Sequence, residues 1–126
     1  MTATRHFAPV LDAYFAAYAR HDAQGCAAAF TKTARLVSQF GPIVEGRSAI
    51  ENLHLDWFED GEENKTWGLL DAEAADGRGH CLIWFEADIP GDAGPERVRG
   101  HSLSILEDTA DEGWKISALS LTIRED

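Results

Sequence analysis

The residues best suited to chemistry in this chain are Tyr14 and His101, with Ser38 as a third polar candidate. A tyrosine hydroxyl and an imidazole N–H are both hydrogen-bond donors, so together they could polarise a carbonyl oxygen. A histidine can also act as an acid or a base, because its usual pKa lies near neutrality. A serine hydroxyl cannot take a proton from carbon without a base beside it. These residue types indicate acid/base chemistry on a small molecule.

Each of these residues also has a structural interpretation. Tyr14 suits a core aromatic residue whose hydroxyl bonds to the backbone. His101 lies in an apolar row, where a histidine is more often a satisfied core or rim residue than a catalyst. Ser38 suits a small residue of a strand. On the sequence alone, the structural and catalytic interpretations both stay open.

Several other chemistries lack their motifs. The five histidines, at positions 6, 21, 54, 80 and 101, show no HxH, HxxxH or HExxH spacing, so no metal site is predicted. The chain contains no GxGxxG or GxxxxGK loop for a nucleotide and no GxSxG elbow for a hydrolase triad. The prediction is a site with neither metal nor cofactor.

Composition restricts the class of protein and its partners. A chain of 126 residues fits a single domain, residues 1–126, with one core. Twenty-two acidic residues against eleven basic ones give a net charge of −11, which repels nucleic acids and anionic membranes. No apolar run approaches the ~20 residues that span a bilayer, and the first residues do not resemble a signal peptide. Only two cysteines, Cys26 and Cys81, are present, which favours buried thiols in the cytoplasm.

The elements that must position these residues are helices first and strands afterwards, which predicts an α+β fold. Apolar residues at helical spacing predict a first helix over about residues 4–20. These residues are Phe7, Leu11, Tyr14, Phe15 and Tyr18. Asp22 is placed to cap a short second helix. The remaining predicted elements are a second helix over 23–30, a strand over 34–40 and a third helix from 48 to about 58.

From residue 66 onward the pattern predicts an antiparallel meander. Its four strands cover about 66–75, 80–88, 97–106 and 114–123. Asp76-Gly77 is a strong hairpin signal, because both residues tolerate positive φ. Period-two alternation predicts that two rows pack on the helices, while the face of the last strand stays ambiguous. The rows are Cys81, Ile83, Phe85 and Ala87, and His101, Leu103 and Ile105. Trp84 then lies on the outer face, either as a dimer contact or as an isolated surface residue.

Three segments resemble the nuclear-transport-factor-2-like superfamily. They are VLDAYFAAYARHDAQGCAAAF (10–30), VEGRSAI (44–50) and EGWKI (112–116). This superfamily includes ketosteroid isomerases, scytalone dehydratase and polyketide cyclases. The resemblance covers nearly the whole chain and is more specific for fold than for activity. It implies a cone-shaped, curved antiparallel sheet wrapped around N-terminal helices (a cystatin-like roll) with an apolar pocket inside the cone.

The resemblance also implies roles for single residues. Tyr14 matches the tyrosine that donates a hydrogen bond to the substrate oxyanion in ketosteroid isomerases. His101 falls near the position of the protonated aspartate that assists there, although a shift of one residue would place Ser102 instead. Ser38 matches the position of the aspartate base, and this departure argues against steroid isomerisation. A tyrosine and a histidine in one pocket are similar to scytalone dehydratase.

The leading hypothesis is a homodimer, joined through the outer sheet face, that binds a small apolar molecule. Whether it is an enzyme stays open. If it is, we expect a cofactor-independent isomerase, dehydratase or cyclase in which Tyr14 donates a hydrogen bond and His101 is the acid/base or second donor. The alternative is a non-catalytic ligand sensor or protein-interaction domain. The predicted cavity lining is Leu36, Phe40, Leu53, Trp57, Phe85 and Leu103, with Ser38 as a polar contact.

Overall fold

The computed structural model of the protein describes residues 2–124. Helices precede most of the strands, and this order confirms the α+β class. The helices are α1 (Thr2–Ala19), α2 (Ala23–Ala27) and α3 (Arg47–Glu59). The strands are β1 (Phe30–Val37), β2 (Val44–Glu45), β3 (Glu63–Ala75), β4 (Arg78–Gly91), β5 (Gly94–Thr109) and β6 (Gly113–Arg124).

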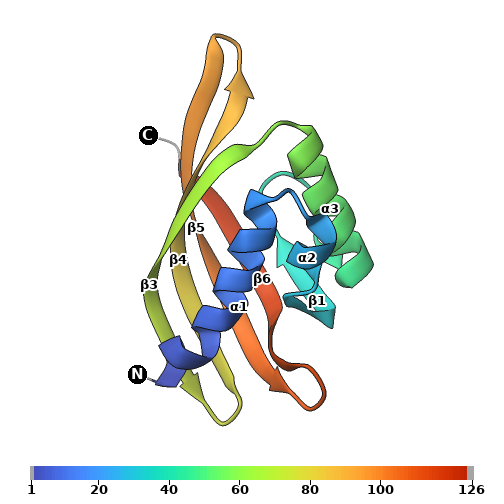
Figure 1. Cartoon of the computed structure of the whole chain (residues 1–126), viewed down its shortest axis with the longest axis vertical. Coiled ribbons are helices and arrows are strands. Elements are labelled where there is room, and N and C mark those ends of the chain that lie inside the picture. Colours follow the sequence, from blue (N-terminus) through green and yellow to red (C-terminus); the bar gives the residue numbers. More distant parts are fainter. Residues whose placement is uncertain (1, 125–126) are drawn as a thin grey trace.

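The strands form one curved sheet in the order β2-β1-β6-β5-β4-β3. Neighbouring strands are antiparallel, except that β1 runs parallel to β6. Helix α1 lies across the sheet, and α2 and α3 lie beside it near β1 (Figure 1). The tip of the β4–β5 hairpin extends beyond the helices, at the end of the molecule opposite the N-terminus. This arrangement is the predicted cystatin-like roll.

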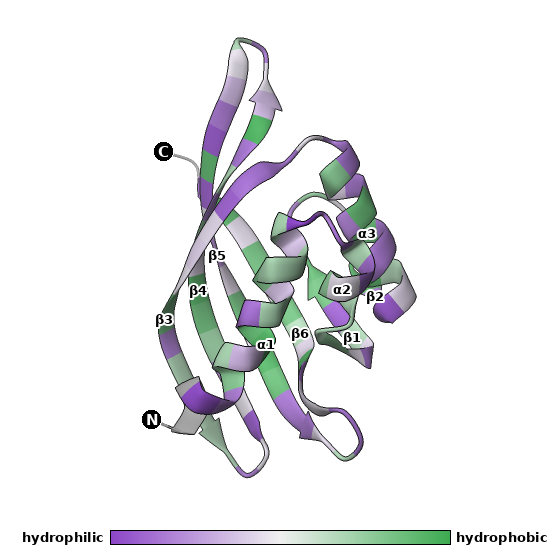
Figure 2. Cartoon of the chain, in the orientation of Figure 1, coloured by the Kyte–Doolittle hydropathy of each residue, from purple (hydrophilic) through white to green (hydrophobic). Residues whose placement is uncertain are grey.

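Helix α1 is held to the sheet by one apolar face. Phe7, Leu11, Tyr14 and Tyr18 recur every three or four residues and are all buried, as the spacing predicted. Phe15 is partly buried and stacks on Trp67 of β3, with ring centroids 4.4 Å apart. Hydrophobic residues also mark the parts of β4 and β6 that lie behind α1 (Figure 2). No helix within residues 2–124 has both the length and the apolar character needed to cross a membrane.

Two local predictions are confirmed by backbone geometry. The Asp22 carboxylate accepts a hydrogen bond from the Gly25 N–H at 3.0 Å and so caps α2. Asp76 and Gly77 join β3 to β4 with φ values of 55° and 77°, as the two-residue hairpin requires. Both features depend on residues close together in the chain, which is why the sequence predicts them.

The prediction for the inner face of β5 is wrong. Opposite residues in an antiparallel pair share a face, and β5 places Ser104 opposite Cys81 and Ser102 opposite Ile83. Ser102 and Ser104 are therefore buried, while Leu103 and Ile105 are 45% and 40% exposed on the outer face.

The small residues of β5 face inward because the inner face has little space for larger side chains at these positions. An added Cβ at Gly100, which shares the inner face, would lie 2.6 Å from Cζ of Phe85. Small residues on this side of β5 leave room for large side chains that enter from β4 and α1.

The ambiguity of β6 has a structural cause. The β5–β6 register shifts between Ile105 and Leu106, so both Ile116 and Leu119 turn inward and are buried. A strict alternation would have placed only one of these two residues inside. Beyond the shift, Leu121 and Ile123 continue the inner row and line a cavity between the sheet and the helices.

Both cysteine thiols are free and buried. Burial raises the pKa of Cys26 to about 12 and that of Cys81 to about 11. Both thiols are therefore protonated at neutral pH, and they serve as small apolar core groups.

Candidate functional site

Within residues 2–124, two cavities lie between the helices and the concave face of the sheet. The outer one has a volume of about 650 Å³. Its wall consists of Tyr18, Phe40, Leu53, Asp56, Trp57, Asp60, Glu62, Lys65, Phe85, Ile89, Pro90, Val98, Leu121 and Ile123. The inner one, beneath α1, has a volume of about 20 Å³, enough for about one water molecule. Lys65, Phe85 and Leu121 line both cavities and so separate them.

Some of the residues predicted to line a pocket do lie at the outer cavity. These are Phe40, Leu53, Trp57 and Phe85. Leu36 is buried in the core and lines neither cavity. Ser38 follows the end of β1, where its hydroxyl accepts a hydrogen bond from the Phe40 N–H at 3.3 Å. Leu103 faces away from both cavities, so its predicted place in the lining is wrong.

Tyr14 lines the inner cavity and is bonded to a histidine that the sequence did not single out. Its hydroxyl lies 2.8 Å from Nε2 of His54, a fully buried residue of α3. Nδ1 of His54 lies 2.8 Å from the carbonyl oxygen of Ile50, one helical turn earlier. Because a carbonyl can only accept, Nδ1 must carry the proton. Nε2 is then an acceptor, and the Tyr14 hydroxyl donates to it.

This bond removes the donor role that was predicted for Tyr14. Burial lowers the pKa of His54 to about 4 and raises the pKa of Tyr14 well above its usual value, so both are neutral at pH 7. The single hydroxyl proton of Tyr14 is committed to His54. Toward a ligand, the hydroxyl can therefore only accept a hydrogen bond.

His101 does not reach the pocket, and its predicted position there is wrong. It lies opposite Trp84 in the β4–β5 pair, on the outer face of the sheet. Its neighbour Ser102 is 7% exposed and lines the inner cavity with Tyr14. Ser102, the alternative one residue further along the chain, therefore lies at the cavity, because β5 turns its small residues inward.

Lys65 and Glu62 are charged side chains in the wall of the outer cavity. Lys65 belongs to β3, where it shares the inner face with Trp67. Its Nζ lies 3.4 Å from Oε1 of Glu62, and the two side chains are only 12% and 16% exposed. The hydroxyl of Tyr18 donates to the other oxygen of Glu62 at 2.7 Å.

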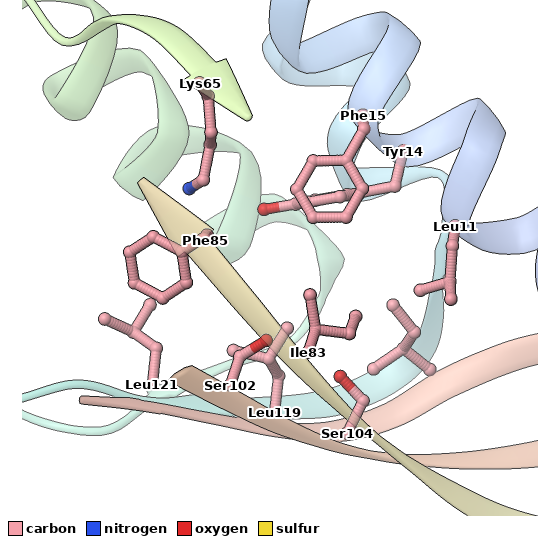
Figure 3. Close-up of a pocket in the computed structure, with 11 residues that line it drawn as sticks. Leu11, Tyr14, Phe15, Lys65, Ile83, Phe85, Ser102, Ser104, Leu119 and Leu121 are labelled. Carbon is pink, nitrogen blue, oxygen red and sulfur yellow. The ribbon is translucent and has the colours of Figure 1, made fainter. Parts of the chain in front are cut away.

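Aromatic rings enclose the ammonium group of Lys65. Nζ lies 4.0 Å from the ring centroid of Tyr18 and 4.6 Å from that of Phe85. Figure 3 shows the Lys65 side chain directed toward the space between the Phe85 ring and the Tyr14 hydroxyl. Burial lowers the pKa of Lys65, and the adjacent Glu62 carboxylate acts in the opposite direction. The alternation of Lys65 with Trp67 and Leu69 was the sequence signal for its inward position.

The entrance of the outer cavity is negatively charged. Asp56 and Asp60 line it at the C-terminal end of α3, where no basic residue compensates the helix dipole. The net charge of −11 adds to this potential. An anionic ligand is therefore disfavoured at the entrance, and the apolar wall beyond it suits an uncharged molecule.

The family comparison gives one clear result. Residues 11–109 match the model of the SnoaL-like domain. No curated protein matches the sequence significantly.

Solved structures with the same fold cover nearly the whole chain. A ketosteroid isomerase-like protein from Erwinia carotovora atroseptica superposes with a TM-score of 0.86 at 15% identity, over 97% of this chain and 96% of that one. An uncharacterized protein with a cystatin-like fold from Caulobacter vibrioides gives 0.83 at 15% identity, over 99% and 92%. An NTF2-like protein from Novosphingobium aromaticivorans gives 0.81 at 12% identity, over 98% and 83%. These identities establish the fold alone.

Proposed function

The chain belongs to the SnoaL-like domain family, and from this premise we propose that it binds a small, uncharged, mostly apolar molecule and moves a proton on it without a cofactor. The observation that carries the proposal is a cavity of about 650 Å³ that has Lys65 and Glu62, a shielded ion pair, in its wall. Isomerisation, dehydration and cyclisation each use such a proton transfer.

The size and lining of the outer cavity support small-molecule binding. Ligand sites typically have volumes of roughly 300–1,000 Å³ and combine apolar walls with a few polar groups. Here Leu53, Trp57 and Leu121 supply apolar wall. A ligand in this space would contact Glu62 and Lys65 without needing a charge of its own.

We assign the role of base to Glu62. It supplies the carboxylate that is missing at Ser38, from a different part of the fold. The Tyr18 hydroxyl and the Lys65 ammonium fix its orientation. A carboxylate held in this way, at the wall of a largely apolar cavity, can accept a proton from the carbon next to a ligand carbonyl.

Two variants of α3 test the binding proposal. Leu53→Trp fills part of the cavity, whereas Leu55→Trp places the same side chain at an exposed position two residues away. Calorimetric titration with 2-naphthalenemethanol, an uncharged two-ring probe, should show binding to the wild type and to Leu55→Trp. Loss of binding in Leu53→Trp alone supports the outer cavity as the site, and equal binding by both variants refutes it.

Hydrogen–deuterium exchange tests proton transfer. The protein in D₂O should accelerate deuterium incorporation next to the carbonyl of 4-phenylbutan-2-one, as followed by NMR. Glu62→Gln should reduce this acceleration by about 10²-fold or more, since it removes the base. Glu63→Gln removes the neighbouring exposed carboxylate, which does not line the cavity; this matched control should retain the acceleration. Probe binding without any exchange would instead favour a non-catalytic ligand sensor.

We also propose that the protein is a homodimer joined through the outer sheet face. Leu103 and Ile105 are 45% and 40% exposed there, and Leu82 and Trp84 of β4 lie beside them. A contiguous apolar patch of this kind is typical of an interaction surface. Self-association through the same patch on two copies would cover it.

A further inference from the structure

Lys65 differs from the other two lysines of the chain in its surroundings. Lys32 is an exposed side chain, 69% accessible, with Asp111 as an ion-pair partner. Nζ of Lys115 donates to the carbonyl oxygen of Ala28 at 2.7 Å, near the surface. Lys65 alone lies in the wall of both cavities, with a side chain that is 12% exposed.

The positive charge of the Lys65 ammonium group has few compensating partners for a side chain that is so buried. It has three N–H donors, and within residues 2–124 Glu62 is its only ion-pair partner. The rings of Tyr18 and Phe85 occupy two other sides. Removal of water disfavours the charged form, and this lowers the pKa of the group. Glu62, 3.4 Å away, is in position to take the proton that leaves.

We propose that Lys65 is a nucleophile that forms an imine with an apolar aldehyde or ketone in the outer cavity. This inference rests on the binding function proposed above and names the class of ligand. It also supplies an electron-withdrawing group for proton transfer, because a protonated imine acidifies the neighbouring carbon more than a carbonyl does.

The atoms of this step balance without an added reagent. Lys65 first transfers a proton from its ammonium group to Glu62. The free amine then attacks the carbonyl carbon, a C–N bond forms, and one proton moves from the nitrogen to the oxygen to give a neutral carbinolamine. Glu62 returns its proton to the hydroxyl, the nitrogen lone pair expels water as the C–O bond breaks, and a protonated imine remains beside the Glu62 carboxylate.

The surroundings select a neutral, apolar carbonyl compound. Asp56 and Asp60 at the entrance disfavour carboxylate-bearing substrates such as keto acids. The walls formed by Leu53 and Trp57 favour an aromatic or aliphatic body.

Reductive trapping tests the inference on the full chain. The protein is incubated at pH 7 with 2-naphthaldehyde and sodium cyanoborohydride, and the modified lysines are identified by peptide mass mapping. Lys65 should be labelled at least about tenfold faster than Lys32 or Lys115, because the cavity holds the aldehyde beside an amine whose pKa burial lowers. Lys65→Arg should lose this fast adduct, and thermal unfolding of the variant verifies its fold. The comparison among the three lysines of the wild type needs no variant.

The failure of this inference can be separated from failure of the proposed function. 2-Naphthalenemethanol has the same rings but cannot form an imine. Binding of this alcohol together with labelling of Lys65 no faster than that of Lys32 overturns the imine and leaves the binding function intact. A different result would be that the alcohol does not bind and that Leu53→Trp does not slow the labelling of Lys65. This result overturns the proposed function and the substrate class together.

Discussion

The hydroxyl of Tyr14 donates a hydrogen bond to Nε2 of His54, and this bond connects α1 to α3. The carbonyl of Ile50 fixes the tautomer of the imidazole and so fixes the direction of the bond. The tyrosine most similar to a catalytic one therefore holds two helices together. The Glu62 carboxylate and the Lys65 ammonium group lie in the wall of the outer cavity, where we propose that acid/base chemistry occurs.

Removal of the Tyr14 hydroxyl should reduce stability more than ligand binding. Tyr14→Phe leaves Nε2 of His54 buried without a donor, and we expect a loss of about 1–3 kcal/mol in the free energy of unfolding. Urea denaturation measures this loss. The double variant Tyr14→Phe/His54→Leu should be destabilised by less than the sum of the two single variants, because it removes both partners. Strict additivity would show that the bond contributes nothing.

The free energy of unfolding should decrease as the pH falls from 6.5 toward 4, because of the buried His54. Burial lowers the pKa of the folded histidine from 6.5 to about 4. Between these values the unfolded chain binds a proton that the folded chain does not, so unfolding becomes easier as the pH falls. The full effect is about 3 kcal/mol, and it is absent above pH 6.5.

Urea denaturation at pH 7, 6 and 5 measures this effect in a range where most carboxylates are still ionised. His54→Leu is the matched variant and should lose the dependence between pH 6.5 and 5. The exposed His6 and His21 remain in that variant. An identical pH dependence in the two proteins would contradict the assignment to His54.

A methyl group at Gly100 should disturb the wall between the cavities. Its Cβ would lie 2.3 Å from the carbonyl oxygen of Thr122 and 2.6 Å from Phe85. We expect Gly100→Ala to cost about 1–3 kcal/mol, because backbone and ring must both move. Gly41→Ala, at a position with nothing within 4 Å and no positive φ, is the control and should leave the unfolding free energy nearly unchanged. Equal stability of both variants would refute the close packing of Phe85.

The proposed dimer should depend on the outer face of β5. Leu103→Glu introduces a charge into the exposed apolar patch and should convert the protein to a monomer, as measured by light scattering after gel filtration. Leu55→Glu changes a residue of similar exposure, 41%, on α3 and should leave the dimer intact. A wild-type protein that is monomeric at millimolar concentration would exclude this interface.

The sequence by itself determined the elements whose signals are local. The apolar spacing from Phe7 to Tyr18 defines the buried face of α1, Asp22 caps α2, and Asp76-Gly77 makes the β3–β4 hairpin. Each depends on residues within one helix or one turn of the chain. Three segments, residues 10–30, 44–50 and 112–116, were enough to indicate the superfamily, which the family model and the fold confirm.

Tertiary structure alone decided which residues form the site. Period-two alternation defines two faces of β5 but does not say which is inside, and pairing with β4 places Ser102 rather than His101 at the cavity. His54 becomes the partner of Tyr14 because α3 packs against α1, across 40 residues of sequence. Lys65 lies just outside the predicted strand 66–75, and only the packing of Phe85 and Tyr18 encloses its ammonium group. Elements distant in the chain bury these side chains and supply their hydrogen-bond and ion-pair partners. Burial and partners then set the charge and hydrogen bonding of each side chain, on which its chemistry depends.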